Sequence, residues 1–294
     1  MPASITKLKL GLPSGSLQDM TLRMFEKAGL NVRVRDRSYR PTINDDAISC
    51  ILLRAQEIPK YIQEGVLDAG IAGKDWMLET RAKVVEVADL PYTKTGLGKM
   101  RLVIAVPNAS RINEVADLEG KRIATELVNV TKGYLSRNGV KAKVEFSWGA
   151  TEAKAPELCD AISELTETGS SLRANNLRIV STILESTTRF MANKQAMLSP
   201  WKRSKIEELA TLLRGAVEAE SKVGLKLNVN KGNLDRLLSL LPSLKKPTIS
   251  PLSDGAWVAV EIIVDKNVSK LLIPKLKNVG AQGIVEYPLN MIIE

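Results

Sequence analysis

Apolar and polar positions along the first part of the chain follow the two spacings typical of strands and helices. Residues 7–12 read as a short strand, and residues 17–28 carry apolar side chains at helical spacing before Gly29 ends the pattern. A second strand over 49–53 is followed by a helix over 57–64. Strands and helices that alternate in this way predict an α/β fold.

The same alternation continues in what we expect to be a second lobe. A buried strand over 101–106 is broken by Pro107, and we place the start of the second lobe there. Its other predicted elements are strands over 123–125, 143–146, 161–165 and 177–184 and a helix over 131–138. Residues 188–192 read as a strand that returns to the first sheet. Two lobes joined by two crossings form a cleft, which is where ligands usually bind.

The rest of the chain is expected to hold one long helix and a third domain. Ser199 suits the N-cap of that helix and Pro200 its first turn, and its apolar stripe is typical of a packing or dimer face. The pattern that follows is β-α-β-β-α-β, which is typical of a ferredoxin-like fold but identifies no ligand. The expected boundaries are residues 1–105 and 185–215 for lobe I, 106–184 for lobe II and 216–294 for the third domain.

The segment from Glu157 to Leu172 carries the most informative pattern in the chain. A short apolar strand over 161–165 runs into a turn of small residues around Gly169. Such a turn lets several backbone N–H groups point at one anion, and nearby hydroxyls add further donors. The candidate hydroxyl donors are those of Thr168, Ser170 and Ser171.

Two carboxylates, Glu164 and Glu167, accompany this turn. Carboxylates can bind sugar hydroxyls directly, or they can bind a magnesium ion that lies next to a phosphate. The segment therefore predicts a site for a phosphorylated ribose. The glycine-containing turn at 13–16 precedes a helix and suits a second anion, with a plain structural turn as the alternative.

Composition excludes several kinds of catalytic chemistry but says less about the fold. The chain has no histidine, which excludes Ser-His-Asp and Cys-His nucleophiles, His-ligated metals and imidazole acid–base catalysis. Its two cysteines, Cys50 and Cys159, cannot form a structural zinc site by themselves. The chemistry must therefore use carboxylates, hydroxyls, Lys and Arg, backbone dipoles or an oxygen-bound ion such as Mg²⁺.

The charge balance favours anionic small molecules as partners. There are 42 Lys and Arg against 33 Asp and Glu, which gives a net charge of +9. A solvated surface is the simplest alternative, and nucleic acid is disfavoured because the charge is scattered and aromatic residues are only 4%. No apolar stretch approaches the roughly 20 residues of a membrane helix, and residues 1–15 lack a signal-peptide core. We therefore expect a cytoplasmic protein that does not bind membranes.

Four segments occur in the order and at the separations of one enzyme family. Residues 10–17 are similar to its N-terminal Pro-Lys-Gly turn, and residues 53–75 to its Arg-x-x-Asp-Ile-Pro and Asp-x-Gly-Ile-x-Gly-x-Asp block. Residues 149–177 match its signature for 5-phosphoribosyl 1-pyrophosphate (PRPP), and residues 246–252 resemble its regulatory domain. From about residue 7 onward the chain resembles the long form of ATP phosphoribosyltransferase, the first enzyme of histidine biosynthesis.

The resemblance implies a reaction, a fold and a mode of regulation. Adenine N1 of ATP would attack C1 of PRPP with inversion and release pyrophosphate, with Mg²⁺ required. The catalytic lobes would have the periplasmic-binding-protein arrangement, and the C-terminal ferredoxin-like (ACT-like) domain would mediate feedback inhibition by L-histidine. Long-form members are typically dimers that assemble into hexamers. The rival hypothesis is a non-catalytic two-lobed small-molecule binding or regulatory protein, which the intact turn around Gly169 disfavours.

The resemblance also assigns site residues, position by position. The residues implied to bind PRPP are Glu164, Glu167, Thr168, Gly169, Ser170, Ser171 and Leu172. The residues implied on the ATP side are Gly15, Ser16, Arg54, Gly73 and Asp75. The residues implied to contact histidine are Asn228, Leu244, Thr248 and Gly283. Mg²⁺ would be held mainly through substrate phosphates, with Glu164 as a further candidate ligand.

Three positions depart from the usual pattern of the family. Ser14 stands where many members have Lys, which removes one phosphate-pairing charge, whereas Glu164 for Asp and Ser171 for Thr keep the functional group. No residue is assigned as a general acid or base, because adenine N1 is already a nucleophile. Orientation between two lobes can supply on the order of 7–11 kcal/mol of the acceleration, and cations such as Arg54 can stabilise the leaving pyrophosphate.

Overall fold

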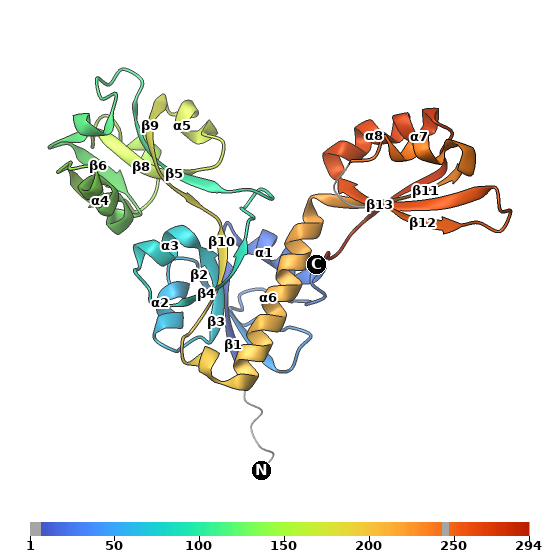
Figure 1. Cartoon of the computed structure of the whole chain (residues 1–294). Coiled ribbons are helices and arrows are strands. Elements are labelled where there is room, and N and C mark those ends of the chain that lie inside the picture. Colours follow the sequence, from blue (N-terminus) through green and yellow to red (C-terminus); the bar gives the residue numbers. More distant parts are fainter. Residues whose placement is uncertain (1–6, 243–246, 294) are drawn as a thin grey trace, which may run out of the picture. The chain divides into compact units, whose positions relative to one another are not determined.

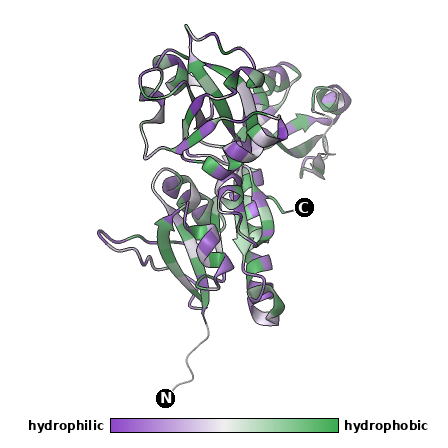
Figure 2. Cartoon of the chain, turned by 90° about the vertical axis from the view of Figure 1, so that its left-hand side faces the viewer, coloured by the Kyte–Doolittle hydropathy of each residue, from purple (hydrophilic) through white to green (hydrophobic). Residues whose placement is uncertain are grey.

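The computed structural model describes residues 7–242 and 247–293 (Figure 1). The chain divides after Thr211 into two units, a larger one that holds two α/β lobes and a smaller one that begins at Leu212. In Figure 2 the strands are mostly hydrophobic, whereas hydrophilic positions gather on helices and loops. Every helix within the described ranges is too short or too polar to cross a membrane.

Lobe I is built on a five-stranded mixed sheet. In spatial order its strands are β2 (Ile48–Arg54), β1 (Leu8–Ser14), β3 (Ala69–Gly73), β10 (Thr188–Ala192) and β4 (Val85–Leu90). The first three strands run parallel, and β10 runs antiparallel to both of its neighbours. The helices of this lobe are α1 (Gln18–Lys27), α2 (Ile58–Gln63) and α3 (Lys74–Glu79). The predicted return of residues 188–192 to the first sheet is therefore confirmed.

Lobe II repeats this plan with a second five-stranded sheet. In spatial order its strands are β7 (Lys143–Phe146), β6 (Arg122–Thr125), β8 (Ala161–Thr166), β5 (Met100–Pro107) and β9 (Leu177–Ser186). Strands β6, β7 and β8 run parallel, so their carboxyl ends meet at one edge of the sheet. The helices are α4 (Val128–Arg137) and α5 (Ser170–Ala174), with single 3₁₀ turns at Val115–Leu118 and Thr151–Ala153.

The chain crosses into lobe II earlier than the sequence analysis expects. Strand β5 pairs with β8 and β9, so residues 100–105 belong to the second sheet and not to lobe I. The break at Pro107 ends this strand and does not separate the lobes. Two elements of lobe I, α3 and β4, were also not predicted. Helix α3 has only six residues and no side-chain cap, and β4 is a short strand of six residues.

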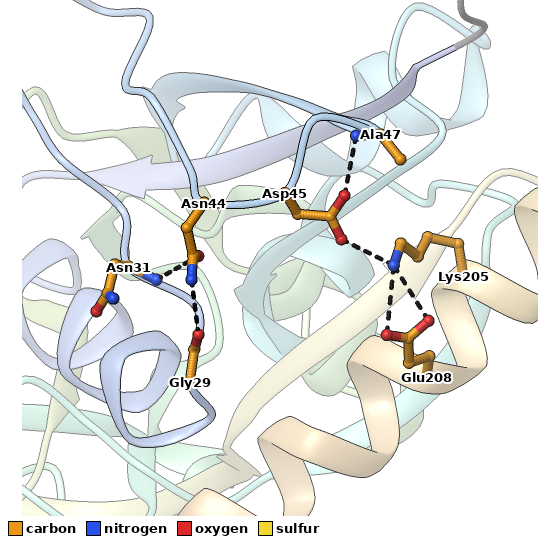
Figure 3. A network of polar contacts seen from close by, with 7 residues as sticks. All are labelled: Gly29, Asn31, Asn44, Asp45, Ala47, Lys205 and Glu208. Carbon is orange, nitrogen blue, oxygen red and sulfur yellow. Dashed lines mark hydrogen bonds and ion pairs between the residues drawn. The ribbon is translucent and has the colours of Figure 1, made fainter.

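Helix α6 (Pro200–Glu220) begins at the predicted proline. Its first turns are tied to lobe I by ion pairs from Lys202 to Asp68 and from Lys205 to Asp45, with N–O distances of 2.7 and 2.8 Å. Figure 3 shows Asp45 held in turn by the N–H of Ala47, at 2.9 Å, while Lys205 also reaches Glu208. The predicted apolar stripe of this helix is buried, which confirms that it is a packing face.

The smaller unit has the predicted β-α-β-β-α-β order. Its elements are β11 (Lys222–Asn230), α7 (Leu234–Leu238), β12 (Thr248–Pro251), β13 (Trp257–Asp265), α8 (Lys266–Asn278) and β14 (Gln282–Pro288). The sheet order is β12-β13-β11-β14, antiparallel throughout. Alternate residues of β11, such as Leu225 and Leu227, pack with Leu272 and Leu276 of α8 in one buried core. The predicted fold class, two α/β lobes followed by a ferredoxin-like domain, is confirmed.

Candidate active site

The predicted anion cup forms where β8 ends and α5 begins. Gly169 adopts a φ of +74°, a conformation that favours glycine, and its N–H donates to Thr166 Oγ1 at 2.9 Å. Gly169 therefore fits the tight turn that the sequence predicted. The first N–H groups of a helix have no acceptor inside the helix. In the part of the chain that the structure describes, no acceptor takes the N–H groups of Thr168, Ser171 or Leu172.

The hydroxyls of the cup are partly engaged within the chain. Thr168 Oγ1 donates to Ser170 Oγ at 3.1 Å, and the hydroxyl of Ser171 donates to the carboxylate of Glu152. The guanidinium of Arg173 donates to the carbonyl of Thr168 at 3.0 Å and so closes the turn from outside. The cup is thus preorganised by its own side chains, which lowers the cost of ordering it around an anion.

Glu164 lies half-buried on β8, the strand that leads into the cup. Burial above all, with the nearby carboxylates of Glu152 and Glu126, raises the pKa of its carboxyl to about 7, although a hydrogen bond from Thr151 opposes the shift. The N–H of Leu165 donates to Glu164 Oε1 at 3.1 Å. In the described part of the chain, no three His, Cys, Asp or Glu residues are grouped so that they could hold a metal ion. The donor set therefore does not fit a metal held by the protein alone.

Glu167, predicted to lie near the ribose, contacts a segment outside the cup. Its carboxylate accepts hydrogen bonds from the hydroxyls of Thr93 and Thr95, with O–O distances of 3.1 and 2.6 Å. Both threonines lie on the segment that crosses from β4 to β5. Glu167 therefore joins the turn of lobe II to the segment that crosses between the lobes. Its partners Thr95 and Thr93 lie 72 and 74 positions away in the sequence, so no local motif predicts the contact.

The N-terminal turn of lobe I brings Gly15 and Arg54 together. Ser14 and Arg54 end the paired strands β1 and β2 opposite each other. Gly15 has a φ of +91°, and a Cβ built on it would lie 3.1 Å from Arg54 Nη1, so the guanidinium rests against the glycine. Arg54 is exposed and makes no ion pair with any residue that the structure describes. Its charge is therefore free to meet an anion.

Asp75, predicted to line the ATP side, lies inside the fold. It is only 4% exposed, and burial raises the pKa of its carboxyl although Ser186 opposes the shift. Ser186 Oγ donates to Asp75 Oδ1 at 2.5 Å and accepts the N–H of Asp75 at 3.0 Å. Gly73 makes room for this pair, because a Cβ there would lie 2.1 Å from Asp75 Oδ1. Asp75 thus ties α3 to the second lobe crossing.

A pocket of about 130 Å³ lies between these elements. Its lining residues are Ser16, Leu17, Ala55, Gly73, Asp75, Trp76, Tyr92, Thr93, Lys94, Met100, Leu165, Ser186, Thr187 and Thr188. The structure therefore brings together Ser16, Gly73 and Asp75 from the predicted ATP side, but neither Gly15 nor Arg54 lines this pocket.

The residues that the sequence analysis missed come from the two lobe crossings. Tyr92 is buried, its hydroxyl lies 2.9 Å from Thr21 Oγ1, and burial raises the pKa of the phenol. Thr188 Oγ1 donates to the carbonyl of Tyr92 at 2.7 Å and so links the two crossings. Lys94 is exposed at the rim. The only signal in the sequence for these residues is that a cleft must be lined by the segments that cross it.

The predicted histidine contacts of the smaller unit are only partly brought together. Gly283 has a φ of +58°, and a Cβ on it would lie 3.7 Å from Asn228 Nδ2, so these two residues are neighbours. Thr248 lies on the edge strand β12, which β13 separates from the strand that carries Asn228. Leu244 lies outside the described residues. Within the chain, Thr248 is therefore not an immediate neighbour of the other two, and its contact with histidine stays a prediction.

Comparisons with known proteins agree along the whole chain. Residues 54–215 match the family model described as ATP phosphoribosyltransferase, and residues 219–291 match the model described as the HisG C-terminal domain. The ATP phosphoribosyltransferase of Chlorobaculum parvum is 59% identical over 294 residues and is covered, like this chain, over 100% of its length. That of Thermodesulfovibrio yellowstonii is 57% identical, with 97% of this chain and 98% of the relative covered.

One solved structure shares the fold at lower identity. The ATP phosphoribosyl transferase (HisG:HisZ) complex from Thermotoga maritima aligns with a TM-score of 0.60 and 29% sequence identity. The alignment covers 70% of this chain and 98% of the other.

Proposed function

We infer the roles of the site residues from one premise: the chain belongs to the ATP phosphoribosyltransferase family, whose relatives match it from end to end. It is a pentosyltransferase that joins adenine N1 of ATP to C1 of PRPP and releases pyrophosphate. The relatives favour this enzyme over the non-catalytic binding protein considered from the sequence. What remains to be proposed is which residues hold each substrate.

The cup is proposed to bind the 5′-phosphate of PRPP. The observation that carries this proposal is the set of N–H groups of Thr168, Ser171 and Leu172, which have no acceptor within the described residues. A phosphate oxygen is a strong acceptor for such groups. The hydroxyls of Ser170 and Thr168, which now bond each other, can turn to the same anion. Glu164 then lies below the ribose, where its carboxyl can accept or donate a hydrogen bond near neutral pH.

The lobe I turn is proposed to bind the polyphosphate oxygens on the ATP side. Arg54 offers a guanidinium without an acidic partner in the described part of the chain, and Gly15 leaves it room. Ser16 and Lys94 add a hydroxyl and a second cation at the pocket. Lys94 can supply the charge that Ser14, in place of the usual Lys, does not.

Mg²⁺ is proposed to arrive with the substrate phosphates, because the protein offers no three-ligand cluster among the described residues. When bound, it would neutralise charge on the leaving pyrophosphate. The chain itself orients adenine N1 towards C1 and excludes water from the reacting atoms. Arg54 stabilises the charge that builds on the leaving group.

Regulation and assembly are proposed from the family alone. The ferredoxin-like unit would bind L-histidine as an inhibitor, with Asn228 and Gly283 as the neighbouring pair that contacts it. The coupling to the active site would be about 1–3 kcal/mol. The protein would work in the cytoplasm as a homo-oligomer, from dimer to hexamer.

Gly169→Val tests the cup. We expect the purified protein to form phosphoribosyl-ATP from ATP, PRPP and Mg²⁺ when pyrophosphatase removes the pyrophosphate. The variant should raise the KM for PRPP at least tenfold more than the KM for ATP, because valine is strained at a φ of +74° and meets Arg173 Nη1 at 3.1 Å.

Gly120→Val is the matched control for that variant. It has a φ of +70° with open space around its Cβ position, and it lies outside the cup. If both variants raise the KM for PRPP equally, the cup does not bind PRPP. Absence of any product from the wild-type protein would refute the catalytic assignment itself.

A further inference from the structure

Helix α4 of lobe II is capped by a residue of lobe I. Glu79, the last residue of α3, accepts the N–H of Asn129 on Oε1 and the N–H of Val130 on Oε2, both at 2.9 Å. These are the second and third residues of α4, the usual donors to an N-cap side chain. The N-cap residue itself, Leu127, offers no side-chain acceptor. The cap that α4 cannot supply locally therefore comes from about 50 residues away.

Two more hydrogen bonds reinforce this contact. Asn129 Nδ2 donates to the carbonyl of Glu79 at 3.0 Å, and Arg81 Nη2 donates to Asn129 Oδ1 at 3.2 Å. Arg81 holds a φ of +53°, which is uncommon for a residue with a side chain and marks a turn kept in place by its surroundings. We call the set of Glu79, Arg81, Asn129 and Val130 the lobe clasp.

The lobe clasp leaves the pocket free. None of its four residues lines the pocket, although Trp76 of the same helix α3 does. At another point Glu167 binds Thr93 and Thr95 of the first crossing. The Glu167 contact involves Thr93, which lines the pocket, whereas the lobe clasp lies apart from that lining, so a ligand in the pocket need not displace the clasp.

We propose that Glu79 is a positioning residue that holds the lobes closed around the substrates by capping α4 from the opposite lobe. The identity of those substrates rests on the proposed function. In an open arrangement the carboxylate and both N–H groups would bind water instead. The clasp is thus made only in the closed state and shifts the population towards it, because a contact changes an equilibrium by its difference between the two states.

Charge and helix dipole strengthen the clasp. The N-terminus of a helix carries a partial positive charge, and α4 has 10 residues, long enough for this field to favour a carboxylate at its end. A helix cap contributes enough to change an equilibrium about 3- to 30-fold. Since both substrates bind in the closed cleft, the affinity for each should fall by up to this factor when the cap is lost.

The test compares Glu79→Ala and Glu79→Gln with wild type. Glu79→Ala should raise the KM for both ATP and PRPP, by up to about 30-fold, with kcat changed less than the KM values. Glu79→Gln keeps one carbonyl acceptor but loses the charge, so its KM values should lie between those of wild type and Glu79→Ala. Thermal melting of each variant verifies that the fold is retained.

Hydrogen exchange supplies a readout that is independent of activity. In Glu79→Ala, peptides over residues 127–131 should exchange faster, and so should the first crossing over 91–99, because opening exposes both. Glu119→Gln is the matched control: Glu119 accepts the N–H of Lys141 at 2.7 Å, but both residues lie in lobe II. That control should change exchange only near Lys141 and leave both KM values unchanged.

The outcomes separate the clasp from the proposed function. Wild-type KM values for both substrates in Glu79→Ala, or a rise for one substrate alone, would overturn the clasp. Faster exchange confined to residues 127–131 would also overturn it, because it would show a local cap without opening of the lobes. If exchange rises in both segments but wild-type protein forms no phosphoribosyl-ATP, the clasp stands and the proposed substrates are wrong.

Discussion

Replacing Glu164 by Gln should change how the stability of the unliganded protein depends on pH. The pKa of this carboxyl rises from an ordinary value of 4.5 to about 7 in the folded chain, chiefly because of burial. A carboxyl with a raised pKa binds its proton more tightly in the folded state than in the unfolded state. Its contribution to stability is therefore full below about pH 4.5 and is lost as the pH rises through about 7.

The magnitude follows from the size of the shift. One pKa unit corresponds to about 1.4 kcal/mol, so the whole shift is worth about 3 kcal/mol, of which about 2 kcal/mol falls between pH 5.5 and pH 8.5. Glutamine has the shape of the protonated carboxyl and does not titrate. Compared with wild type, Glu164→Gln should therefore gain about 2 kcal/mol in relative stability over this pH range.

Urea unfolding without substrates or Mg²⁺ measures this difference. Because Asp75 also has a raised pKa and contributes a trend of the same sign to both proteins, only the difference between wild type and Glu164→Gln isolates Glu164. Glu145→Gln is the flat control: Lys143 and Arg122 lower the pKa of the Glu145 carboxyl, so it is ionised in both the folded and the unfolded state over this range and its loss should leave the pH dependence unchanged. A wild-type-minus-variant difference that is equal at pH 5.5 and pH 8.5 would mean that Glu164 is not desolvated on β8.

Two further predictions concern Gly73 and Asn228. Gly73→Ala should lower the melting temperature by about 2–4 °C for each kcal/mol of stability lost, because its Cβ would lie 2.1 Å from Asp75 Oδ1 and drive the carboxylate off Ser186; an unchanged melting curve would contradict that packing. Asn228→Ala should raise the histidine concentration needed for half-inhibition at least tenfold, measured in the phosphoribosyl-ATP assay, and wild-type sensitivity would remove the Asn228–Gly283 pair from the inhibitor site.

Local features were predictable from the sequence because each depends on neighbouring residues. The turn at Gly169 needs only a glycine among small residues after a strand, and the structure gives it a φ of +74°. The start of α6 at Pro200 depends only on the proline itself. The first residue of a helix does not use its N–H in the helix, so a proline, which has no N–H, fits there. Alternating apolar positions fixed the order of elements in the ferredoxin-like unit for the same reason.

Features that depend on a distant partner were not predictable. The strand over 100–107 reads the same whichever sheet it joins, and only its pairing with β8 and β9 places it in lobe II. Glu167 accepts hydrogen bonds from Thr93 and Thr95, which lie far from it in the sequence. The pair of Asp75 and Ser186 likewise joins distant segments, so neither contact could be predicted from local sequence.

The missing histidines illustrate how the fold changes a conclusion drawn from composition. Without histidine, no side chain has an ordinary pKa just below neutrality, so the sequence analysis based the reaction on charge and positioning alone. Burial on β8 nevertheless gives Glu164 a pKa of about 7. The reaction does not demand a general base, and the carboxyl is fixed by the N–H of Leu165. We therefore expect the protonation of Glu164 to affect substrate binding and not the chemical step. The KM for PRPP should change with pH near neutrality, as it does in enzymes that use a histidine, whereas kcat should not.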